Sequence, residues 1–301
     1  MKNGIARSPL FYVGDKYKLV REIRTHFPEQ INRMIEPFVG GGSVMMNVEA
    51  NRYLLNDIDN YVIAIHQMLC GFIGHEDDFF KQLFNLVNKY GLSLSYLGHT
   101  APEELKQKFP KTYYAKYNKE AYCRLKNDFN NGGKNDMLRL YMLLIYGFNR
   151  MLRFNGKGEF NLPVGDVDFN QNTREALDDY FRLLANKQVE WHNQDFREFL
   201  GKIAYQKGDL VYLDPPYLIT FSEYNKLWND ETECSLLALL DDLNAKGVYF
   251  AISNVTHYKG KTNEAFLKWS AHYNSCPIKS NYISFNDNTI KSFKEVLVTN
   301  Y

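Results

Sequence analysis

Long apolar runs are missing from this 301-residue sequence. A membrane-spanning helix needs roughly 18 or more apolar residues, and the apolar stretch 140–148 has about half that length. The first residues also lack the apolar core and cleavage site of a signal peptide. We therefore expect no membrane partner and a cytoplasmic location.

Paired cysteines and the usual histidine ligand spacings are missing as well. The four cysteines are scattered without a CxxC pair, which suits reduced thiols better than disulfides or a zinc cluster. The seven histidines form no HExxH pattern. We therefore expect no metal site.

The sequence also lacks a strong net charge. The net charge is only +1, which argues against a protein that coats nucleic acid through charge alone. Residues 101–165, however, carry twelve Lys and Arg against six Asp and Glu, a local net charge of +6 that leaves −5 for the remainder. This pattern is typical of a DNA-binding segment inserted into the catalytic domain of an enzyme. A lysine-rich solvated helical surface explains it equally well.

Segments that favour strands alternate with segments that favour helices, which predicts an α/β fold with parallel strands. We expect helical structure at 60–84, 106–129, 136–150, 232–246 and 262–272, the third of these buried. We expect strands starting at 34 and at 52–59, 189–192, 209–213, 248–252, 281–285 and 295–298, and a β-hairpin at 152–165. The mostly helical stretch 60–165 interrupts the alternation and is interpreted as an inserted domain.

A glycine turn follows the first expected strand, in MIEPFVGGGSV at 34–44. Glycines there let the backbone approach a nucleotide or adenosyl group closely. Asp57 ends the next strand, where a carboxylate can accept both ribose hydroxyls. The third spaced glycine of the dinucleotide motif GxGxxG is missing. A tight loop with a helix-capping aspartate explains this segment equally well.

The strongest motif is DLVYLDPPY at 209–217, an apolar strand that ends in Asp214-Pro215-Pro216-Tyr217. The two prolines stop the strand and hold the backbone extended. The Asp214 carboxylate and the Pro215 carbonyl then form neighbouring acceptors at the strand end, and two fixed acceptors orient a planar amine. Tyr217 supplies an aromatic face for a base flipped out of the duplex. The alternative is a proline turn with a surface tyrosine.

The DPPY motif, the PFVGGGS turn and the N-terminal FYVGDK together resemble the Dam-type family of DNA adenine-N6 methyltransferases. The resemblance covers nearly the whole chain. Within the family it is closest to the T-even phage enzyme, notably in FNRMLRFNGKGEFNLPVG, DLVYLDPPYLIT and SNVTHYKGK. It implies a Rossmann-like S-adenosylmethionine-dependent methyltransferase core at 1–59 and 166–301. The mostly helical target-recognition domain with its hairpin is expected at 60–165.

The resemblance also implies roles for single residues. The catalytic motif corresponds to Asp214, Pro215, Pro216 and Tyr217. Cofactor contacts correspond to Tyr12, Lys16, Phe38, Gly40, Gly42, Asp57, Phe196 and Asp214. Contacts with DNA correspond to Phe148, Asn149, Met151, Arg153 and Pro163. Phe148 and Met151 have a plain alternative, the packing of a buried helix end.

The sequence departs from relatives that read GATC in two places. Asp166 and Val167 stand where those relatives carry a basic residue, and Phe11 stands where the bacterial enzyme has a DNA-contacting lysine. An acid that faces DNA would be repelled by phosphate. Either another residue reads that base pair or the recognition site has changed. We expect GATC or a related short palindrome.

These features predict direct transfer of a methyl group from S-adenosylmethionine to a flipped adenine in double-stranded DNA. We expect a monomer or weak dimer in the cytoplasm of a bacterial or phage-infected cell, with a companion restriction endonuclease as an open alternative to an orphan enzyme. Rival interpretations are an amine methyltransferase acting on RNA or protein, a nicotinamide-dependent oxidoreductase, and a non-catalytic DNA-binding module. The first leaves the basic insertion unexplained, the second leaves DPPY unexplained, and the third leaves Lys16, Asp57 and Asp214 unexplained.

Overall fold

The structure, a computed structural model, describes residues 4–220, 228–279 and 293–301. The chain divides into two compact units. We call residues 1–15, 40–46 and 59–186 the helical unit, and residues 16–39, 47–58 and 187–301 the sheet unit. The strand expected at 281–285 lies outside the described residues.

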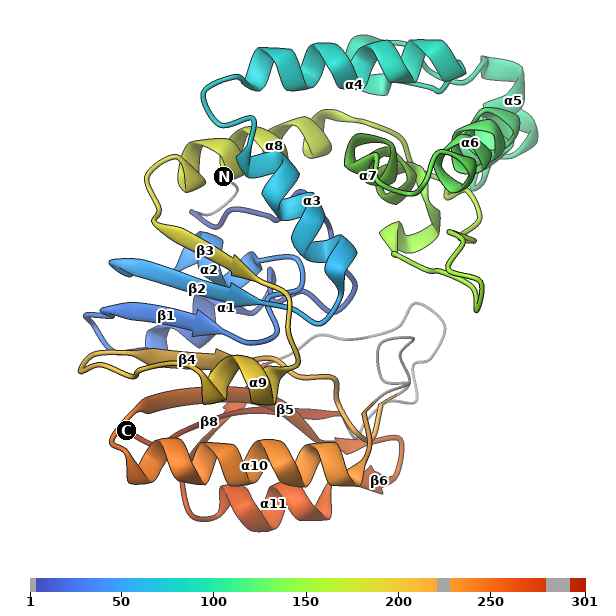
Figure 1. Ribbon diagram of the computed structural model, residues 1–301. Helices are drawn as coiled ribbons and strands as arrows, with labels where there is room; N and C mark the ends of the chain where they lie inside the picture. Colours follow the sequence, from blue (N-terminus) through green and yellow to red (C-terminus); the bar gives the residue numbers. More distant parts are fainter. Residues whose placement is uncertain (1–3, 221–227, 280–292) are drawn as a thin grey trace. The chain divides into compact units, whose positions relative to one another are not determined.

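The sheet unit contains a mostly parallel sheet, as the sequence predicted (Figure 1). Its strand order is β3-β2-β1-β4-β5-β8-β7, and β6 pairs with β5. Strands β1 to β5 pair in parallel, whereas β8 runs antiparallel to both β5 and β7. The order 3-2-1-4-5 is that of doubly wound Rossmann-like sheets, so the predicted fold class is confirmed. The strands are β1 (Arg33–Glu36), β2 (Arg52–Asn56), β3 (Val189–His192), β4 (Leu210–Leu213), β5 (Tyr249–Tyr258), β6 (Lys261–Thr262), β7 (Asn274–Ile278) and β8 (Lys294–Thr299).

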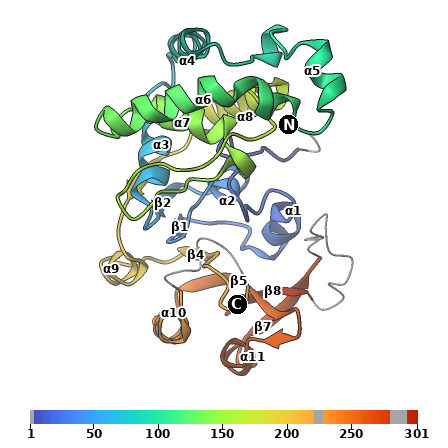
Figure 2. The same ribbon diagram turned by 90° about the vertical axis from the view of Figure 1, so that its right-hand side faces the viewer.

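Both faces of the central strand β4 are buried, which is why its sequence is a continuous apolar run. Val211 and Leu213 pack with helices α9 (Phe196–Gly201), α10 (Asp230–Ala245) and α11 (Glu264–Ser270). On the other face, Tyr212 contacts Phe27, which follows helix α1 (Val20–Ile23) and the short helix η1 (Arg24–His26). Figure 2 shows α1 across the sheet from α9 and α10.

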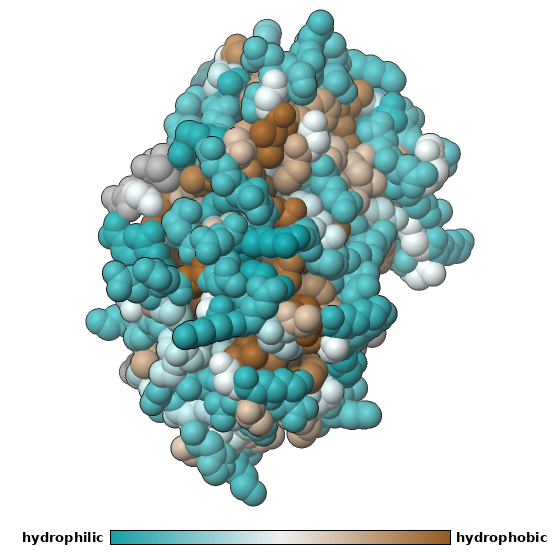
Figure 3. Space-filling model, turned by 60° about the vertical axis from the view of Figure 1, so that its left-hand side comes forward, coloured by the Kyte–Doolittle hydropathy of each residue, from teal (hydrophilic) through white to brown (hydrophobic). Residues whose placement is uncertain are grey.

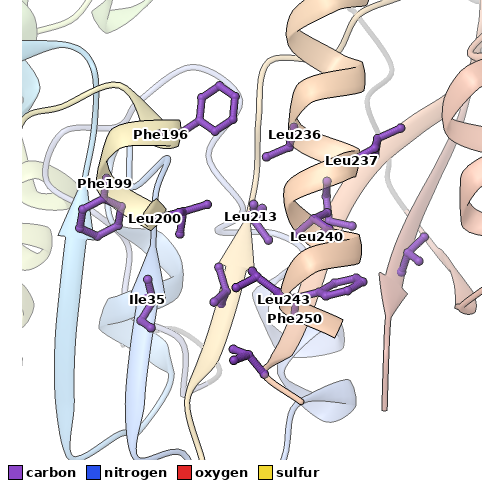
Figure 4. Close-up of a cluster of buried hydrophobic side chains, with 14 of the residues drawn as sticks. Ile35, Phe196, Phe199, Leu200, Leu213, Leu236, Leu237, Leu240, Leu243 and Phe250 are labelled. Carbon is purple, nitrogen blue, oxygen red and sulfur yellow. The ribbon is translucent and has the colours of Figure 1, made fainter. Parts of the chain in front are cut away.

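Helix α10 shows how the sequence pattern forms this core. Leu236, Leu240 and Leu243 recur at helical spacing and are almost completely buried. Their side chains point toward β4, where Leu213 meets them (Figure 4). Asn229 caps the helix by accepting a hydrogen bond from the Thr232 backbone N–H at 2.9 Å. The expected helix at 232–246 is confirmed with a start two residues earlier.

The helical unit is built around α7, which is buried on nearly every face as predicted. Residues 140–146 of this helix are at most 1% exposed, and Asp136 caps its start through the Arg139 backbone N–H. The helix ends at Tyr146, before Gly147, and does not continue to residue 150. The elements of this part are α2 (Ser43–Asn47), α3 (Asn60–Cys70), α4 (Glu76–Tyr90), η2 (Ser95–Leu97), α5 (Glu103–Lys108), α6 (Tyr113–Asn131), α7 (Met137–Tyr146), η3 (Phe148–Arg150) and α8 (Gln171–Leu184).

Two long helices expected from the sequence are each broken in two. The segment 60–84 is interrupted between Cys70 and Glu76, where Gly74 has a φ of 83° that ends regular helix. The segment 106–129 is interrupted between Lys108 and Tyr113, where Pro110 lacks the backbone N–H that a helix interior needs. The helical sequence pattern continues across both breaks, so the sequence analysis did not predict them.

The expected hairpin at 152–165 is present, but it is held by single bridges and not by regular strands. Phe154 pairs with Phe160, and Gly147 pairs with Val164. The Asn155 side chain closes the tip by accepting from the backbone N–H groups of Lys157 and Glu159 at 2.9 and 3.0 Å. Side-chain hydrogen bonds therefore replace strand pairing at the tip.

The division into catalytic and recognition domains stays a prediction. The helical unit includes α8, which contacts η2 and α3, although the sequence interpretation placed residues 171–184 in the catalytic part. On the face drawn in Figure 3, hydrophilic residues cover most of the surface and hydrophobic ones form small groups between them. Across the described ranges, none of the helices combines the length and the apolar character needed to cross a membrane.

Candidate active site

Phe38 of the glycine-turn motif and Asp214 of the DPPY motif follow strands at the same edge of the sheet. The strand order reverses between β1 and β4, because β2 and β3 follow to one side of β1 while β5 lies on the other side of β4. In doubly wound sheets, ligands bind at the carboxyl ends of the strands at such a reversal, which is called the topological switch point. We call this side of the sheet the switch-point edge. Phe38 follows β1 there and Asp214 follows β4. The fold alone therefore identifies this edge as the candidate site.

Lys16, Asp214 and Tyr217 lie together at this edge. The Lys16 Nζ is 2.7 Å from Asp214 Oδ2, and it lies 5.1 Å from the centre of the Tyr217 ring. The Tyr217 hydroxyl lies 2.9 Å from Asp214 Oδ1. Lys16 is 3% exposed, whereas the Asp214 side chain is 20% exposed, so a carboxylate fixed by a buried cation stays accessible. The sequence predicted these residues, and the structure brings them together.

A fourth member of this cluster, Glu295, was missed from the sequence. Its Oε1 lies 2.9 Å from the Tyr217 hydroxyl and 3.8 Å from Lys16 Nζ, and its side chain is fully buried. Glu295 is the second residue of strand β8, between Lys294 and the apolar residues that follow it. A buried charge requires partners, and Tyr217 and Lys16 supply them here.

Glu36, the last residue of β1, was also missed. It is 2% exposed, and its Oε1 has no hydrogen-bond partner in the part of the chain that the structure describes. Burial raises the pKa of Glu36 well above its ordinary value, and the charge of nearby Asp214 raises this pKa further, while Lys187 lowers it. Burial therefore favours the neutral form of Glu36 at this edge of the sheet.

An aromatic cluster lies at the same edge and includes two of the predicted cofactor-contacting aromatic residues. The ring centres of Phe38 and Phe196 are 5.3 Å apart. Trp228, which the sequence analysis missed, lies 5.6 Å from Phe38 and 5.7 Å from Phe196. The Trp228 indole N–H donates to Glu233 at 2.6 Å, and Glu233 also accepts from two buried asparagine side chains. These aromatic faces suit a planar heterocycle.

Asp57 directly follows β2 and is half-buried. The loop that carries it is fixed by the Asn193 side chain, which donates to the backbone carbonyls of Asp57 at 2.8 Å and Ile58 at 3.1 Å. The position at the strand end is the one predicted for an acid that binds a ribose. The ribose contact itself stays a prediction.

Within the helical unit, the glycine turn packs against Tyr12. A Cβ added to Gly41 would lie 2.9 Å from Tyr12 Cβ, closer than real Cβ atoms approach. Gly40 and Gly42 have φ angles of 47° and 75°, which favour glycine. The structure thus brings Tyr12 to the predicted turn and shows why side chains are excluded there.

His66 holds the same turn from helix α3. Its Nε2 lies 2.9 Å from the Gly40 carbonyl oxygen, and its Nδ1 lies 2.9 Å from the Tyr180 hydroxyl. A carbonyl only accepts, so Nε2 carries the proton and Nδ1 accepts from Tyr180. Burial lowers the pKa of His66 to about 4, so the ring is neutral near pH 7. No pattern in the sequence predicted this role.

Comparison with known proteins identifies the family. The family model for D12 class N6 adenine-specific DNA methyltransferases matches residues 12–283. The chain belongs to this family. The predicted membership in the family of DNA adenine-N6 methyltransferases is thereby confirmed, and a special closeness to the T-even phage enzyme stays a prediction.

The relatives of this D12-class chain include modification enzymes. It is 35% identical to the type II methyltransferase M.FokI of Planomicrobium okeanokoites over 99% of this chain and 43% of that protein. It is 33% identical to the modification methylase StsI of Streptococcus sanguinis over 98% of this chain and 43% of the relative. The DNA adenine methylase of Serratia marcescens is 28% identical over 70% of this chain and 67% of the relative. The chain thus spans less than half the length of the first two relatives.

The predicted DNA-side residues surround a strained turn. Asn149 and Arg150 have φ angles of 53° and 51°, and Phe11 has a φ of 49°. The Arg150 guanidinium stacks on the Phe11 ring at 3.8 Å. Phe148 is 52% exposed, so it does not pack as the end of a buried helix. Left-handed backbone at several non-glycine residues is typical of functional sites.

The remaining predicted DNA residues lie on the hairpin or at its base. Arg153 donates to the Asn161 side-chain oxygen at 2.9 Å and to the Asn161 backbone carbonyl at 3.0 Å, which orients the guanidinium along the hairpin. Pro163 is exposed, and its carbonyl accepts from the Phe148 backbone N–H at 2.9 Å. Met151 is half-buried. Their contacts with DNA stay predictions.

Asp166, one of the departures from GATC-reading relatives, has a structural partner. Its Oδ1 accepts from the backbone N–H groups of Tyr114 and Ala115 at 2.8 and 3.1 Å. These groups lie in the first turn of α6, where a carboxylate is favoured by the unpaired N–H groups and the helix dipole. The carboxylate is therefore engaged by the helix.

Proposed function

We propose that this protein is a site-specific DNA adenine-N6 methyltransferase that uses S-adenosylmethionine. The observation that carries the proposal is the partly exposed carboxylate of Asp214, fixed by Lys16 and Tyr217 at the edge where the strand order reverses. A single accessible carboxylate beside an aromatic face suits an exocyclic amine on a planar base. The activity is a proposal for the whole protein because the chain spans only part of its longer relatives.

Asp214 and Pro215 would orient the amine of a flipped adenine. The Asp214 carboxylate and the Pro215 carbonyl each accept one N–H, which turns the nitrogen lone pair toward the methyl donor. During transfer the Asp214 carboxylate would stabilise the positive charge that develops on the amine nitrogen. The amine then releases one proton, for which Asp214 is the nearest acceptor. Pro216 holds the backbone extended, and Tyr217 supplies a stacking face.

The residues at the two predicted cofactor segments fit an adenosyl group. S-adenosylmethionine, when bound, supplies an electrophilic methyl group on a sulfonium sulfur. Glycine at position 41 lets Tyr12 pack directly on the turn, because a Cβ there would lie 2.9 Å from Tyr12 Cβ. Carboxylates suit ribose hydroxyls and an ammonium group, and aromatic rings suit adenine. We propose cofactor contacts for Tyr12, Lys16, Phe38, Gly40, Gly42, Asp57, Phe196 and Asp214.

The strained turn and the hairpin would contact DNA. Exposed Phe148 is suited to wedge beside the flipped base, and Asn149 projects from the same turn. Arg153 offers a base or phosphate contact, with Met151 and Pro163 beside it. This assignment supports residues 60–165 as the target-recognition domain. The net positive charge of residues 101–165 favours binding to the phosphate backbone of DNA.

The relatives and the composition also support a proposal for the biological setting. We propose GATC or a related short palindrome as the target, with a T-even-like phage enzyme as the nearest functional parallel. Two relatives are named as modification methylases or type II methyltransferases, which supports a companion restriction endonuclease. Scattered cysteines suit a reducing cytoplasm. A monomer or weak dimer is the proposed working state.

Nucleoside analysis tests this proposal. Unmethylated duplex DNA, RNA and a protein mixture are each incubated with the protein and labelled S-adenosylmethionine. The proposal predicts N6-methyldeoxyadenosine in digested DNA and negligible label in RNA and protein, and mapping of the modified adenines identifies the target sequence. Label confined to RNA or protein, or appearing on cytosine, would refute it.

A further inference from the structure

Glu295 reaches the candidate site because β8 is antiparallel to its neighbours. The parallel strands β4 and β5 end at the switch-point edge, so an antiparallel strand begins there. Glu295 is the second residue of β8 and pairs with Val255. A side chain from a strand two places away in the sheet is thereby brought to the residues that follow β4.

Hydrogen-bond counting shows that Asp214 and Glu295 compete for the same donors. The Tyr217 hydroxyl has one proton and lies 2.9 Å from a carboxylate oxygen of each acid. The Lys16 ammonium is likewise within ion-pair distance of both, at 2.7 Å from Asp214 and 3.8 Å from Glu295. One hydroxyl and one ammonium therefore bridge two buried or half-buried carboxyl groups.

We propose that Glu295 is a positioning residue for methyl transfer, acting on Asp214 through the Tyr217 hydroxyl and Lys16. This inference rests on the proposed function. Glu295 draws the hydroxyl proton and part of the ammonium charge toward itself. Lone pairs of Asp214 are then left available for the adenine amine, while the carboxylate stays fixed on both oxygens. Glu295 does not touch the substrate in this account.

The first experiment compares Glu295→Gln with wild type in single-turnover methyl transfer, at saturating DNA and cofactor. Glutamine keeps the size of the side chain but removes its charge, so Tyr217 and Lys16 shift toward Asp214. We expect a transfer rate lower by about 10- to 100-fold, the scale of a hydrogen bond to a charged group. The dissociation constant of S-adenosylmethionine, measured by calorimetry, should stay within about threefold.

Asp209→Asn is the matched control for the loss of a buried carboxylate. Asp209 is 1% exposed, is paired with Arg33 at 2.5 Å, and directly precedes β4, so it lies at the opposite end of that strand from Asp214. We expect this variant to lower the thermal midpoint while leaving the transfer rate of the folded protein unchanged. A rate loss equal to that of Glu295→Gln would show a general effect of core damage and would overturn the proposal.

Tyr217→Phe tests the proposed route, because it removes the hydroxyl and keeps the stacking ring. In the Tyr217→Phe background, Glu295→Gln should cost much less than in wild type, since the bridge is already absent. If the rate loss of the double variant equals the product of the two single-variant losses, the inference is overturned. A Glu295→Gln transfer rate within threefold of the wild-type rate would also overturn the inference. Because the wild type would be active in that case, the proposed function would stand. A wild type that methylates no adenine would refute the proposed function and this inference together.

Discussion

The Lys16 ammonium lies 2.7 Å from the Asp214 carboxylate although 198 residues separate the two in the sequence. The pair joins the segment before α1 to the end of β4, and Lys16 is almost completely buried. Removing one member of a buried ion pair leaves an uncompensated charge, which is strongly destabilising. The pair therefore fixes the acid of the DPPY motif within the sheet unit and links its geometry to the N-terminal FYVGDK motif.

Asp57→Ala should weaken S-adenosylmethionine binding by about 1.5–3 kcal/mol, the scale for losing hydrogen bonds to a charged acceptor. The loop should keep its shape, because Asn193 holds the backbone carbonyl of Asp57 and not its side chain. Calorimetry measures the affinity, and Asp57→Asn, which keeps one acceptor oxygen, should give a smaller loss. Unchanged affinity in Asp57→Ala would mean that the acid serves only the local fold.

Arg153→Ala should separate base reading from phosphate contact. A bidentate arginine contact with a base contributes about 1–3 kcal/mol of discrimination, whereas a phosphate contact weakens binding to all sequences alike. Lys157→Ala, at the exposed tip of the same hairpin, is the charge-matched control. Loss of preference among near-cognate sites in Arg153→Ala alone indicates base reading. A uniform loss with a shallower salt dependence indicates phosphate contact. No change in either would place recognition elsewhere, with the Lys106–Lys126 segment as the next candidate.

Asp166→Ala should lower the free energy of unfolding by about 0.5–2 kcal/mol, because two backbone N–H groups of α6 lose their acceptor. DNA affinity should stay within about threefold of wild type. Urea titration and fluorescence anisotropy measure the two quantities. A large gain in DNA affinity without loss of stability would show that the carboxylate repels phosphate, as its sequence position first suggested.

His66 should make stability depend on pH below neutrality. Its pKa in the folded protein is about 4, below the ordinary value of 6.5, because burial disfavours the charged ring. The unfolded chain therefore binds more protons between these values, so this contribution is complete above pH 6.5 and is lost as the pH falls toward 4. The slope is at most about 1.4 kcal/mol per pH unit. Urea titrations from pH 7 to 5 should show a smaller decline for His66→Gln, and equal slopes would contradict the assignment.

Local patterns in the sequence predicted much of this structure. The apolar strand before Asp214, the buried helix α7 and the hairpin at 152–165 each follow from neighbouring residues. The breaks near Gly74 and Pro110 were missed because apolar periodicity continued across them.

Most of the site residues that were missed depend on contacts between distant parts of the chain. Tyr217 and Glu295 are 78 residues apart and meet only because β8 is antiparallel. Asp166 reaches α6 from 52 residues away. No spacing rule predicts such contacts.

The most direct test of the central claim is methyl transfer by Asp214→Ala. The carboxylate is proposed to act on the target amine, so the variant should form no detectable N6-methyldeoxyadenosine. Cofactor binding should stay largely intact, with the calorimetric affinity for S-adenosylmethionine lowered by no more than about tenfold for the loss of one contact. Nucleoside mass spectrometry after incubation with duplex DNA measures the product. Transfer within tenfold of the wild-type rate would contradict the role of Asp214, and with it this account of the site.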